Sequence, residues 1–552
     1  MVESSRAAEQ SAGWGVIGML AAAQFIMVLD TTVMNVSISQ VVTDLNTTIV
    51  GLQTAITMYT LVMAAFMLIG GKIGDRWGAK RTFWIGLLVY GTGSFITAIS
   101  RNLTELLVGW SLIEGLGAIL VIPAIAALTA ATYKGKQRAL CYGILGGVAG
   151  ASMAAGPLIG GWVTANFTWR YVFAGETVIV LFVMLFLKLI PGTVGRKSKL
   201  DLGGAILSAV GLGAIVLGVL QSSRWGWITP KAGVPTVNGQ PLAPLGLSPT
   251  IWLIALGAFL LVWFARLERK VKDRGDEPLL DLALLGIFRM RAGLVVQACQ
   301  AFIIQATFFV LPLYLQTVLG YDALKTGKVI LPMSVGLFVF ALGGSALTGR
   351  YAPRVIVQRG LFAMLVGEVL LLYFLGPQLA TGFALGLAIL GAGLGLLASQ
   401  VGNVIMSSVD PSRGGEAGGL QGTSLNLGAS LGVALVGSIV IGLLVSNFTT
   451  TVMASPTLPD SVKQQVQAAA QKNANFVSTA QVESAAKEAG LPPDQTAELV
   501  DTYSAAQLNA LRAGFAFLAF SALIALAWVR RLPSRPDTTG APVEMTTEAG
   551  AS

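Results

Sequence analysis

The chain has 552 residues, of which 54% are hydrophobic, only 11% are charged and 66 are glycine. This composition excludes a soluble globular domain and indicates a polytopic membrane protein. The net charge of +9 comes from short basic clusters at the ends of apolar runs, which indicates loops at a membrane surface and not the single basic face of a nucleic-acid-binding protein.

Apolar runs of about 20 residues are long enough to cross a bilayer as helices. We find fourteen such runs, at residues 14–35, 50–70, 82–100, 103–130, 138–162, 170–190, 202–220, 250–266, 293–318, 326–348, 357–376, 380–406, 417–446 and 510–530. The first is long, carries Asp30 and lacks a cleavage pattern, so we expect a retained helix and not a signal peptide. Most of the 36 Lys and Arg residues fall on one side if both termini are cytoplasmic, which predicts that orientation.

Two longer polar segments interrupt the apolar runs. Residues 221–249 are rich in Pro, Gly and Trp and are predicted to form an irregular outer loop. Residues 447–509 are rich in Ala and Gln, with prolines as helix breakers, and are predicted to form an outer insert. This insert either caps the exit path or docks another protein, or it is a tolerated solvated insertion, which we favour.

The predicted organisation is an all-α membrane protein with two six-helix bundles and two inserted helices. Its segments are a cytoplasmic N-terminus (1–13), an N-terminal bundle (14–190), an inserted helix pair (191–275), a C-terminal bundle (276–530) and a disordered cytoplasmic tail (531–552).

Residues 70–81, between the second and third runs, concentrate glycine, cations and one carboxylate. Such charge cannot lie in hydrocarbon, so we expect a short loop at the membrane surface, with glycines that allow the tight turn. The loop is either a latch that forms in one conformation and breaks in another, or only a cationic anchor. A faint echo at 347–354 indicates a duplicated architecture, with the substrate site between the halves.

Four carboxylates lie well inside predicted spans, away from the span ends, where a charge is costly and usually marks a pathway or a proton relay: Asp30, Glu114, Glu176 and Glu368. Counting about 1.5 Å per helical residue puts the first and third roughly 9 Å, and the second roughly 15 Å, from the outer surface. If these three share a cavity, burial and mutual repulsion favour their protonated forms, which suits proton exchange near neutral pH. Alternatively, Glu114 and Glu176 only hydrogen-bond across helices. Glu368 either lines the cavity or is buried structurally.

The fifth run contains small residues and one proline: Gly156, Pro157, Gly160 and Gly161. Small residues let helices approach closely, and the proline allows a bend. This pattern indicates glycine packing and, beyond it, a helix that slides against its neighbour, so a bulky residue at Gly156 should block the movement.

Polar and aromatic side chains within several runs are candidates to line an amphipathic cavity, the aromatic rings supplying apolar surface and cation–π contacts. Aromatic residues in a spanning helix also face lipid or neighbouring helices. The candidates are Gln24, Asn35, Gln297, Gln300, Phe308, Tyr314, Gln316 and Asn403.

Together these motifs resemble the major facilitator superfamily and, within it, the drug:proton antiporters with fourteen spanning helices. The matches to the superfamily's loop between helices 2 and 3 are Gly71, Asp75, Arg76, Gly78, Lys80 and Arg81. Residues 156–161 look like the antiporter signature, and residues 29–36, 169–173 and 314–316 are similar to the fourteen-helix group. The resemblance favours the latch, because an anchor needs neither Asp75 nor the glycine spacing.

The chain departs from the family in its fourth and sixth helices. Ser111 and Glu114 stand where the family usually has an arginine and a glutamine, and Gly175-Glu176 stands in place of an asparagine-containing turn. The missing arginine removes the usual counter-charge of a first-helix acid, and both changes add acid, which favours cationic cargo.

The resemblance implies a proton-coupled secondary transporter that exports hydrophobic, cationic or amphipathic compounds by alternating access. The expected location is the plasma membrane, the inner membrane of a bacterium, where a monomer contacts lipid, a small-molecule substrate and protons but no nucleic acid. The alternative is a facilitator, or an exporter of an endogenous metabolite or lipid without strict proton coupling. We expect no enzyme, cofactor or metal, because there is no histidine, phosphate-binding loop or nucleophile–base set, and the two cysteines, Cys141 and Cys299, lack metal-site spacing.

Overall fold

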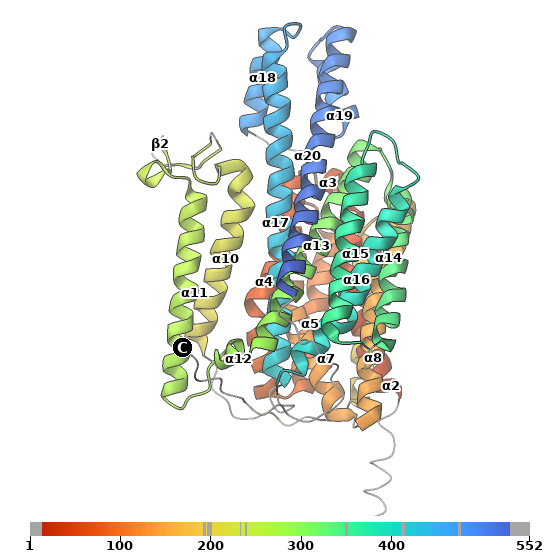
Figure 1. The fold of residues 1–552 in the computed structure, drawn as a ribbon, viewed down its shortest axis with the longest axis vertical. Coiled ribbons are helices and arrows are strands. Elements are labelled where there is room, and N and C mark those ends of the chain that lie inside the picture. Colours follow the sequence, from red (N-terminus) through yellow and green to blue (C-terminus); the bar gives the residue numbers. More distant parts are fainter. Residues whose placement is uncertain are drawn as a thin grey trace, which may run out of the picture.

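The computed structural model describes residues 14–529, except for 134, 191, 193–194, 196–200, 232, 238–239, 348–350, 410–413 and 473–475. The described part is an all-α bundle with one two-stranded sheet (Figure 1). The predicted N-terminal segment, the tail 531–552 and the centre of the echo at 347–354 lie outside the described residues.

The elements of the first half follow the predicted runs closely. They are α2 (Trp14–Val36), α3 (Ile38–Asp44), α4 (Ile49–Trp77), α5 (Ala79–Ile99), α6 (Leu103–Leu106), the π-helix η1 (Leu107–Glu114), α7 (Gly115–Thr132), α8 (Gly135–Asn166), α9 (Arg170–Leu185) and the 3₁₀ turn η2 (Leu187–Leu189).

The inserted pair and the second half complete the chain. They comprise α10 (Leu202–Trp225), β1 (Thr236–Val237), β2 (Gln240–Pro241), the 3₁₀ turn η3 (Pro244–Gly246), α11 (Pro249–Asp273), α12 (Ala283–Gly286), α13 (Phe288–Leu313), the π-helical η4 (Tyr314–Val318), α14 (Ala323–Ala346), α15 (Pro353–Phe374), α16 (Phe383–Met406), α17 (Gly414–Ala454), α18 (Asp460–Lys472), α19 (Thr479–Glu488) and α20 (Pro493–Trp528).

Twelve helices in the described part of the chain are long and apolar enough to cross a membrane, and the bent α8 raises the number to thirteen. The sixth predicted span corresponds to α9, which has only 16 residues. The exact number of fourteen spans therefore stays a prediction.

The prediction of a loop over residues 70–81 was wrong in its extent. Helix α4 continues through this segment to Trp77, and α5 begins at Ala79, so only Gly78 lies outside a helix. Gly78 adopts φ of +84°, a conformation that glycine reaches without the clash of a Cβ atom. The charged residues therefore lie on two helix ends that meet at one sharp turn.

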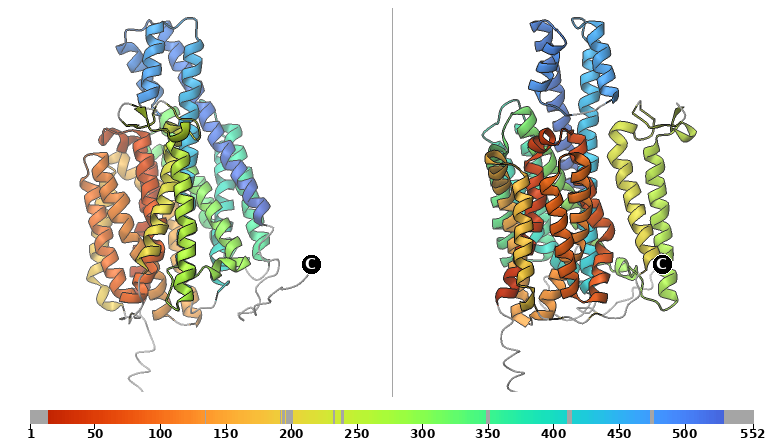
Figure 2. Two further views of the ribbon diagram at one scale, coloured as in Figure 1. Left: turned by 90° about the vertical axis from the view of Figure 1, so that its left-hand side faces the viewer. Right: turned by 180° about the vertical axis from the view of Figure 1, so that it is seen from behind.

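Helix α10 packs the inserted pair against the main bundle, and α11 stands on its far side (Figure 2). Leu61 of α4 and Ala434 of α17 form a buried cluster with apolar residues of α10. Ser438 of α17 adds a hydroxyl that lies 3.0 Å from the Leu220 carbonyl oxygen. The pair thus covers the seam where α4 of the first half meets α17 of the second.

The predicted insert at 447–509 is helical, and its prolines mark helix boundaries as expected. Helices α17 and α20 continue beyond the bundle and carry α18 and α19 at one end (Figure 1). Val452, Leu458, Ala486 and Leu499 form a small core between these helices. We call this the outer end, following the predicted orientation, and the opposite end the inner end. The predicted irregular loop at 221–249 contains the β1–β2 pair.

Candidate functional site: a buried carboxyl cluster

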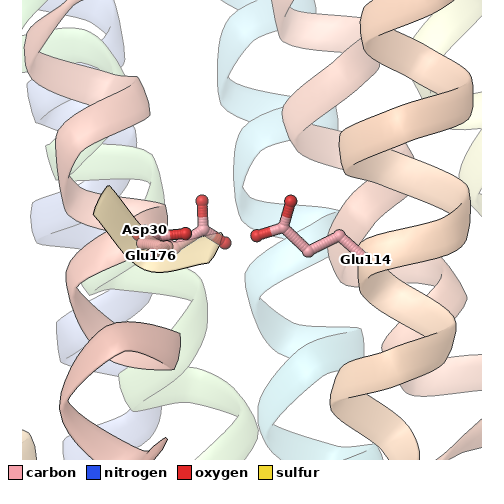
Figure 3. Close-up of side chains that lie close together, drawn as sticks. All are labelled: Asp30, Glu114 and Glu176. Atoms are coloured by element: carbon pink, nitrogen blue, oxygen red, sulfur yellow. The ribbon is translucent and has the colours of Figure 1, made fainter. Parts of the chain in front are cut away.

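Three of the predicted acids meet inside the first half (Figure 3). Asp30 comes from α2, Glu114 from η1 and Glu176 from α9, and one carboxyl oxygen of each lies within 4.8 Å of the other two. Their exposed fractions are 0%, 0% and 1%. We call these three residues the carboxyl cluster.

The local backbone explains how Glu114 reaches this position. Residues 107–114 form a π-helix, in which residues four apart lie on nearly the same face, as they also do in an α-helix. Trp110 and Glu114 therefore both point toward α2 and α9. Gly93 of α5 lies so close to the Glu114 backbone nitrogen that a Cβ atom would collide with it. The absence of that side chain lets α5 and η1 approach closely around the acids.

Asp30 has one partnered oxygen and one unpartnered oxygen. The Trp110 indole N–H donates to Asp30 Oδ1 over 2.7 Å, and the indole stacks on Tyr59 with ring centroids 4.8 Å apart. Asp30 Oδ2 is buried and makes no hydrogen bond within the described residues. The indole thus supplies a neutral donor near the position where the family usually has a cation.

Glu176 is held by two hydroxyl groups of α5. The Tyr90 hydroxyl donates to Oε2 over 3.3 Å, and the Ser94 hydroxyl lies 3.1 Å from the same oxygen. Ser94 Oγ also lies 3.1 Å from the Phe173 carbonyl oxygen. A hydroxyl has one proton, so Ser94 either donates to ionised Glu176, or donates to the carbonyl and accepts from protonated Glu176.

Glu114 has the most exceptional environment of the three. Both of its carboxyl oxygens are buried without a hydrogen-bond partner within the described residues. In that part of the chain no lysine or arginine pairs with any member of the carboxyl cluster. Ser111, which stands where the family usually has arginine, donates to the Ala55 carbonyl oxygen instead.

The cluster can therefore hold fewer negative charges than it has carboxyl groups. Burying an ionised carboxylate costs several kcal/mol even after relaxation, and three like charges at this spacing repel one another. The missing positive charge must come from protons or from a cation that replaces them. Such a group is suited to exchanging protons, provided that the surrounding helices open to water.

Comparison with known proteins decides the family. Residues 20–433 match the family model described as Major Facilitator Superfamily. The chain belongs to the major facilitator superfamily. The fold and the transport function expected from the sequence motifs are confirmed at this level, and the superfamily comprises transporters, not enzymes.

Among the relatives of this superfamily member, the puromycin resistance protein of Streptomyces alboniger is 32% identical over 78% of this chain and 82% of its own length. A probable actinorhodin transporter of Streptomyces coelicolor is 29% identical, over 80% and 74%. The multidrug resistance protein Stp of Mycobacterium tuberculosis is 26% identical, over 80% and 78%. These relatives are resistance and export proteins of bacteria.

Solved structures show the same fold. A bacterial homologue of the lysosomal transporter Spinster, in an inward-facing conformation, has a TM-score of 0.56 at 14% identity, over 95% of this chain and 98% of its own. An auto-inhibited peptide transporter has a TM-score of 0.57 at 12% identity, over 95% and 98%.

The superfamily's charged motif lies at the inner end of α4 and α5. Lys80 donates to the Ile190 carbonyl oxygen over 2.5 Å, and the Arg81 guanidinium lies 6.0 Å from the Trp77 ring. Lys72, near the end of α4, lies 3.9 Å from Glu416 of α17 and so joins the two halves of the transporter. The motif thus contacts both its own half and α17 of the second half. Of the other predicted members, Gly71, Asp75 and Arg76 lie on the end of α4, and Gly78 forms the turn between α4 and α5.

The antiporter-like motif lies where α8 meets α2 and α14. A Cβ atom at Gly156 would collide with the Thr32 hydroxyl, and one at Gly160 would press on Val33. Gly161 lies against the Ala323 carbonyl of the second half, and the Pro157 carbonyl lies against Gly327.

Helix α8 also bends, by 42° between Met153 and Ala155. Pro157 explains the bend, because proline cannot donate to the carbonyl four residues earlier and its ring clashes with it. Ser334 of α14 lies within hydrogen-bond distance of that carbonyl, at Met153.

The predicted substrate-lining residues have different environments. Gln300 donates to the Leu394 carbonyl oxygen, and the Tyr314 hydroxyl donates to the Gly376 carbonyl oxygen, so both tie helices of the second half together. Gln316 instead contacts the first half. Of the remaining candidates, Asn35, Gln297 and Phe308 are buried, Gln24 is half-buried and Asn403 is exposed.

Sequence reasoning missed four residues of the site: Tyr59, Tyr90, Ser94 and Trp110. All four are uncharged, so they carry no cost in a membrane and do not stand out in an apolar run. A signal existed for Trp110, which lies four residues before Glu114 and therefore on the same helix face, but an uncharged indole in an apolar run does not stand out.

Proposed function

We propose that this chain is a proton-coupled exporter of hydrophobic compounds, cationic or amphipathic in character, that works by alternating access in the bacterial plasma membrane. The observation that carries the proposal is the carboxyl cluster, three buried acids without a paired cation in the described part of the chain. The resistance and export functions of the relatives support the drug-like cargo.

The carboxyl cluster would couple the movement of protons to the movement of cargo through its charge. When protonated it is neutral, so the first half can close around it at little electrostatic cost. When protons leave, the charge left behind favours a hydrated, open site or a positive charge on the cargo. Protons and cationic cargo would therefore compete to neutralise the same carboxylates. Antiport requires this competition.

Movement of the helices would give each side of the membrane access in turn. The described outer ends of the two halves are in contact through Gln316, which accepts from the Ser39 backbone N–H and donates to the Val36 carbonyl oxygen. The acids lie below this contact, six residues from the end of α2 in the case of Asp30. We infer that this arrangement is closed to the outside, and that opening it would let outer protons reach the cluster.

Proton-coupled efflux from inverted vesicles tests the proposal. Vesicles containing the protein would be loaded by an imposed proton gradient with cationic probes, such as ethidium and tetraphenylphosphonium, and with neutral dyes. We expect transport of the cations to collapse with the gradient, and Asp30→Asn and Glu114→Gln to lose at least 90%, roughly the tenfold change that corresponds to 1.4 kcal/mol.

Glu488→Gln provides the matched control, because it neutralises an exposed acid in the outer insert. It should transport like wild type. Equal activity in the wild type and in both cluster variants would overturn the carboxylate mechanism. Transport that survives collapse of the gradient would instead identify a facilitator, or an exporter without proton coupling.

A further inference from the structure

The second half repeats the packing of the first around a different buried acid. Helix α5 begins at Ala79 and has glycines at 86 and 93, and α15 begins at Pro353 and has glycines at the same intervals, at 360 and 367. Gly93 packs on the backbone of Glu114, and Gly367 packs in the same way on the backbone of Leu390 in α16. The contact of α5 with η1 in the first half therefore corresponds to the contact of α15 with α16 in the second half.

A second pair of contacts fixes the register of this repeat. A Cβ atom at Gly117 of α7 would collide with the Tyr90 backbone nitrogen, and one at Gly393 of α16 would press on the Met364 backbone nitrogen. Tyr90 lies three residues before Gly93, and Met364 lies three residues before Gly367. Glu114, Tyr90 and Ser94 of the first half thus have identifiable counterparts in the second half.

Those counterparts are apolar, with one exception. Leu390 takes the place of Glu114, and Met364 takes the place of Tyr90. The residue after the second glycine is Ser94 in the first half and Glu368 in the second half. An acid therefore occupies the position where the first half has the hydroxyl that binds Glu176.

Glu368 is as deeply buried as the carboxyl cluster, with an exposed fraction of 0%. Its Oε1 lies 2.9 Å from the Thr307 hydroxyl of α13, and its Oε2 has no hydrogen-bond partner within the described residues. The Thr307 hydroxyl also lies 2.8 Å from the Ile303 carbonyl oxygen. This is the arrangement found at Ser94, one hydroxyl between a backbone carbonyl and a buried carboxyl group.

The Thr307 hydroxyl can satisfy Glu368 in either charge state. It has a single proton, which it donates to the Ile303 carbonyl when protonated Glu368 donates to Thr307 Oγ1, or to Glu368 when that carboxylate is ionised. A purely structural acid needs only one of these arrangements. A site with both is suited to gaining and losing a proton without leaving a hydroxyl unpaired.

No charged group of the neighbouring helices compensates Glu368 in the described structure. Helix α16 contains no charged residue, and the charged residues of α13 lie in its first turn, at Arg289 and Arg291. Arg512 of α20 donates to the Leu375 carbonyl oxygen, seven residues along α15 from Glu368, or about 10 Å. On α15 itself, Arg354 and Arg359 lie in its first two turns, at the inner end.

We propose that Glu368 is a second proton-binding site, located in the second half, which binds and releases one proton separately from the carboxyl cluster. This inference rests on the proposed proton coupling and extends it: each half would carry its own proton site at the same depth, with several acids in the first half and one in the second.

Infrared difference spectroscopy of the purified full-length protein in lipid vesicles tests the proposal. A protonated carboxylic acid has a carbonyl-stretch band that ionisation removes, so a series of spectra from acidic to alkaline pH counts the buried acids that titrate. We expect Glu368→Gln to lack one titrating band that persists in Asp30→Asn and Glu114→Gln. Thr307→Val, a change of one polar group, should shift the pH midpoint of that same band.

Thr317→Val is the matched control, because Thr317 is a buried hydroxyl of η4 that bonds only to the Leu313 carbonyl among the described residues. It should leave the band unchanged. If Glu368→Gln fails to fold, the midpoint shift in Thr307→Val still decides the question. The proposal is overturned if the Glu368 band is missing at every pH, is constant at every pH, or is unaffected by Thr307→Val. Loss of the cluster's titrating bands alone would instead contradict the proposed function.

Discussion

At the scale of single residues, the carboxyl cluster depends on neutral donors. Trp110 donates to Asp30, and Tyr90 and Ser94 contact Glu176. A neutral donor stabilises an ionised carboxylate less than a paired arginine does. Neutralising the negative charge of the cluster is therefore left to protons or to cationic cargo. A permanent internal cation would neutralise it instead and prevent that exchange.

Trp110→Phe should test the role of the indole N–H, since phenylalanine keeps an aromatic ring against Tyr59 and removes the donor to Asp30. A hydrogen bond to a charged group contributes about 1.5–3 kcal/mol. We expect proton-driven efflux to fall and its pH profile to move toward alkaline pH, because ionised Asp30 has lost its donor. Trp252→Phe, which removes the exposed indole donor to the Pro244 carbonyl, is the control. Identical pH profiles in the two variants would exclude a role for the Trp110 donor.

At the scale of elements, helix positions followed from the sequence, whereas the contacts within the site did not. Long apolar runs predicted the spans because a bilayer requires about 20 apolar residues. The end of α4 was misjudged because the helix continues into water as far as Trp77, and hydropathy marks the membrane boundary and not the helix end. Asp30, Glu114 and Glu176 were recognisable one by one as costly charges. Their meeting depends on how the helices pack, including the close approach of α5 to η1 at Gly93, which hydropathy does not encode.

Helix α8 provides a test of movement between elements. Gly156→Ala would place a methyl group against the Thr32 hydroxyl, where the existing packing leaves no room. Overpacking typically costs about 1–3 kcal/mol, so we expect reduced efflux together with a lower melting temperature.

Gly147→Ala, on the same helix with open space around its Cα, is the control. It should transport normally and be as stable as wild type or slightly more so, because alanine favours a helix by about 1 kcal/mol. If Gly156→Ala transports at the wild-type rate, α8 does not need its close approach to α2 for turnover.

At the scale of the whole molecule, the two halves meet at both ends in the described structure. At the outer end, where α2 ends and α3 begins, the Gln316 side chain binds the Ser39 N–H and the Val36 carbonyl oxygen. The break between the two helices leaves these backbone groups free of helical partners. At the inner end Lys72 of α4 faces Glu416 of α17. Alternating access requires that such contacts break and form in turn.

Gln316→Ala should weaken closure at the outer end. Two neutral hydrogen bonds contribute about 1–3 kcal/mol together, so the equilibrium should shift roughly 5- to 150-fold toward outer opening. Spin labels in place of Thr43 and Gln378, in a background without Cys141 and Cys299, would report the distance between the outer ends of the two halves. We expect a larger population at long distance. Gln40→Ala, which removes a hydrogen bond to Asp44 within α3, is the control and should leave the distance distribution unchanged. An unchanged distribution in Gln316→Ala as well would refute a role for Gln316 in closing the outer end.

The charged motif at the inner end should control turnover more than stability. Asp75 lies in the last turn of α4, next to the sharp turn at Gly78, and its charge sets the local balance among the four cations of the motif. Asp75→Asn keeps the shape of the side chain and removes its charge, so we expect efflux to fall severalfold while the melting temperature changes little. Glu277→Gln, an exposed acid between α11 and α12, is the matched neutralisation and should retain wild-type efflux. A normal rate in Asp75→Asn would reduce the motif to a cationic anchor. A large loss of stability in Asp75→Asn would instead make Asp75 a structural group. A latch that forms in only one conformation affects how fast the conformations interconvert and does not hold the fold together.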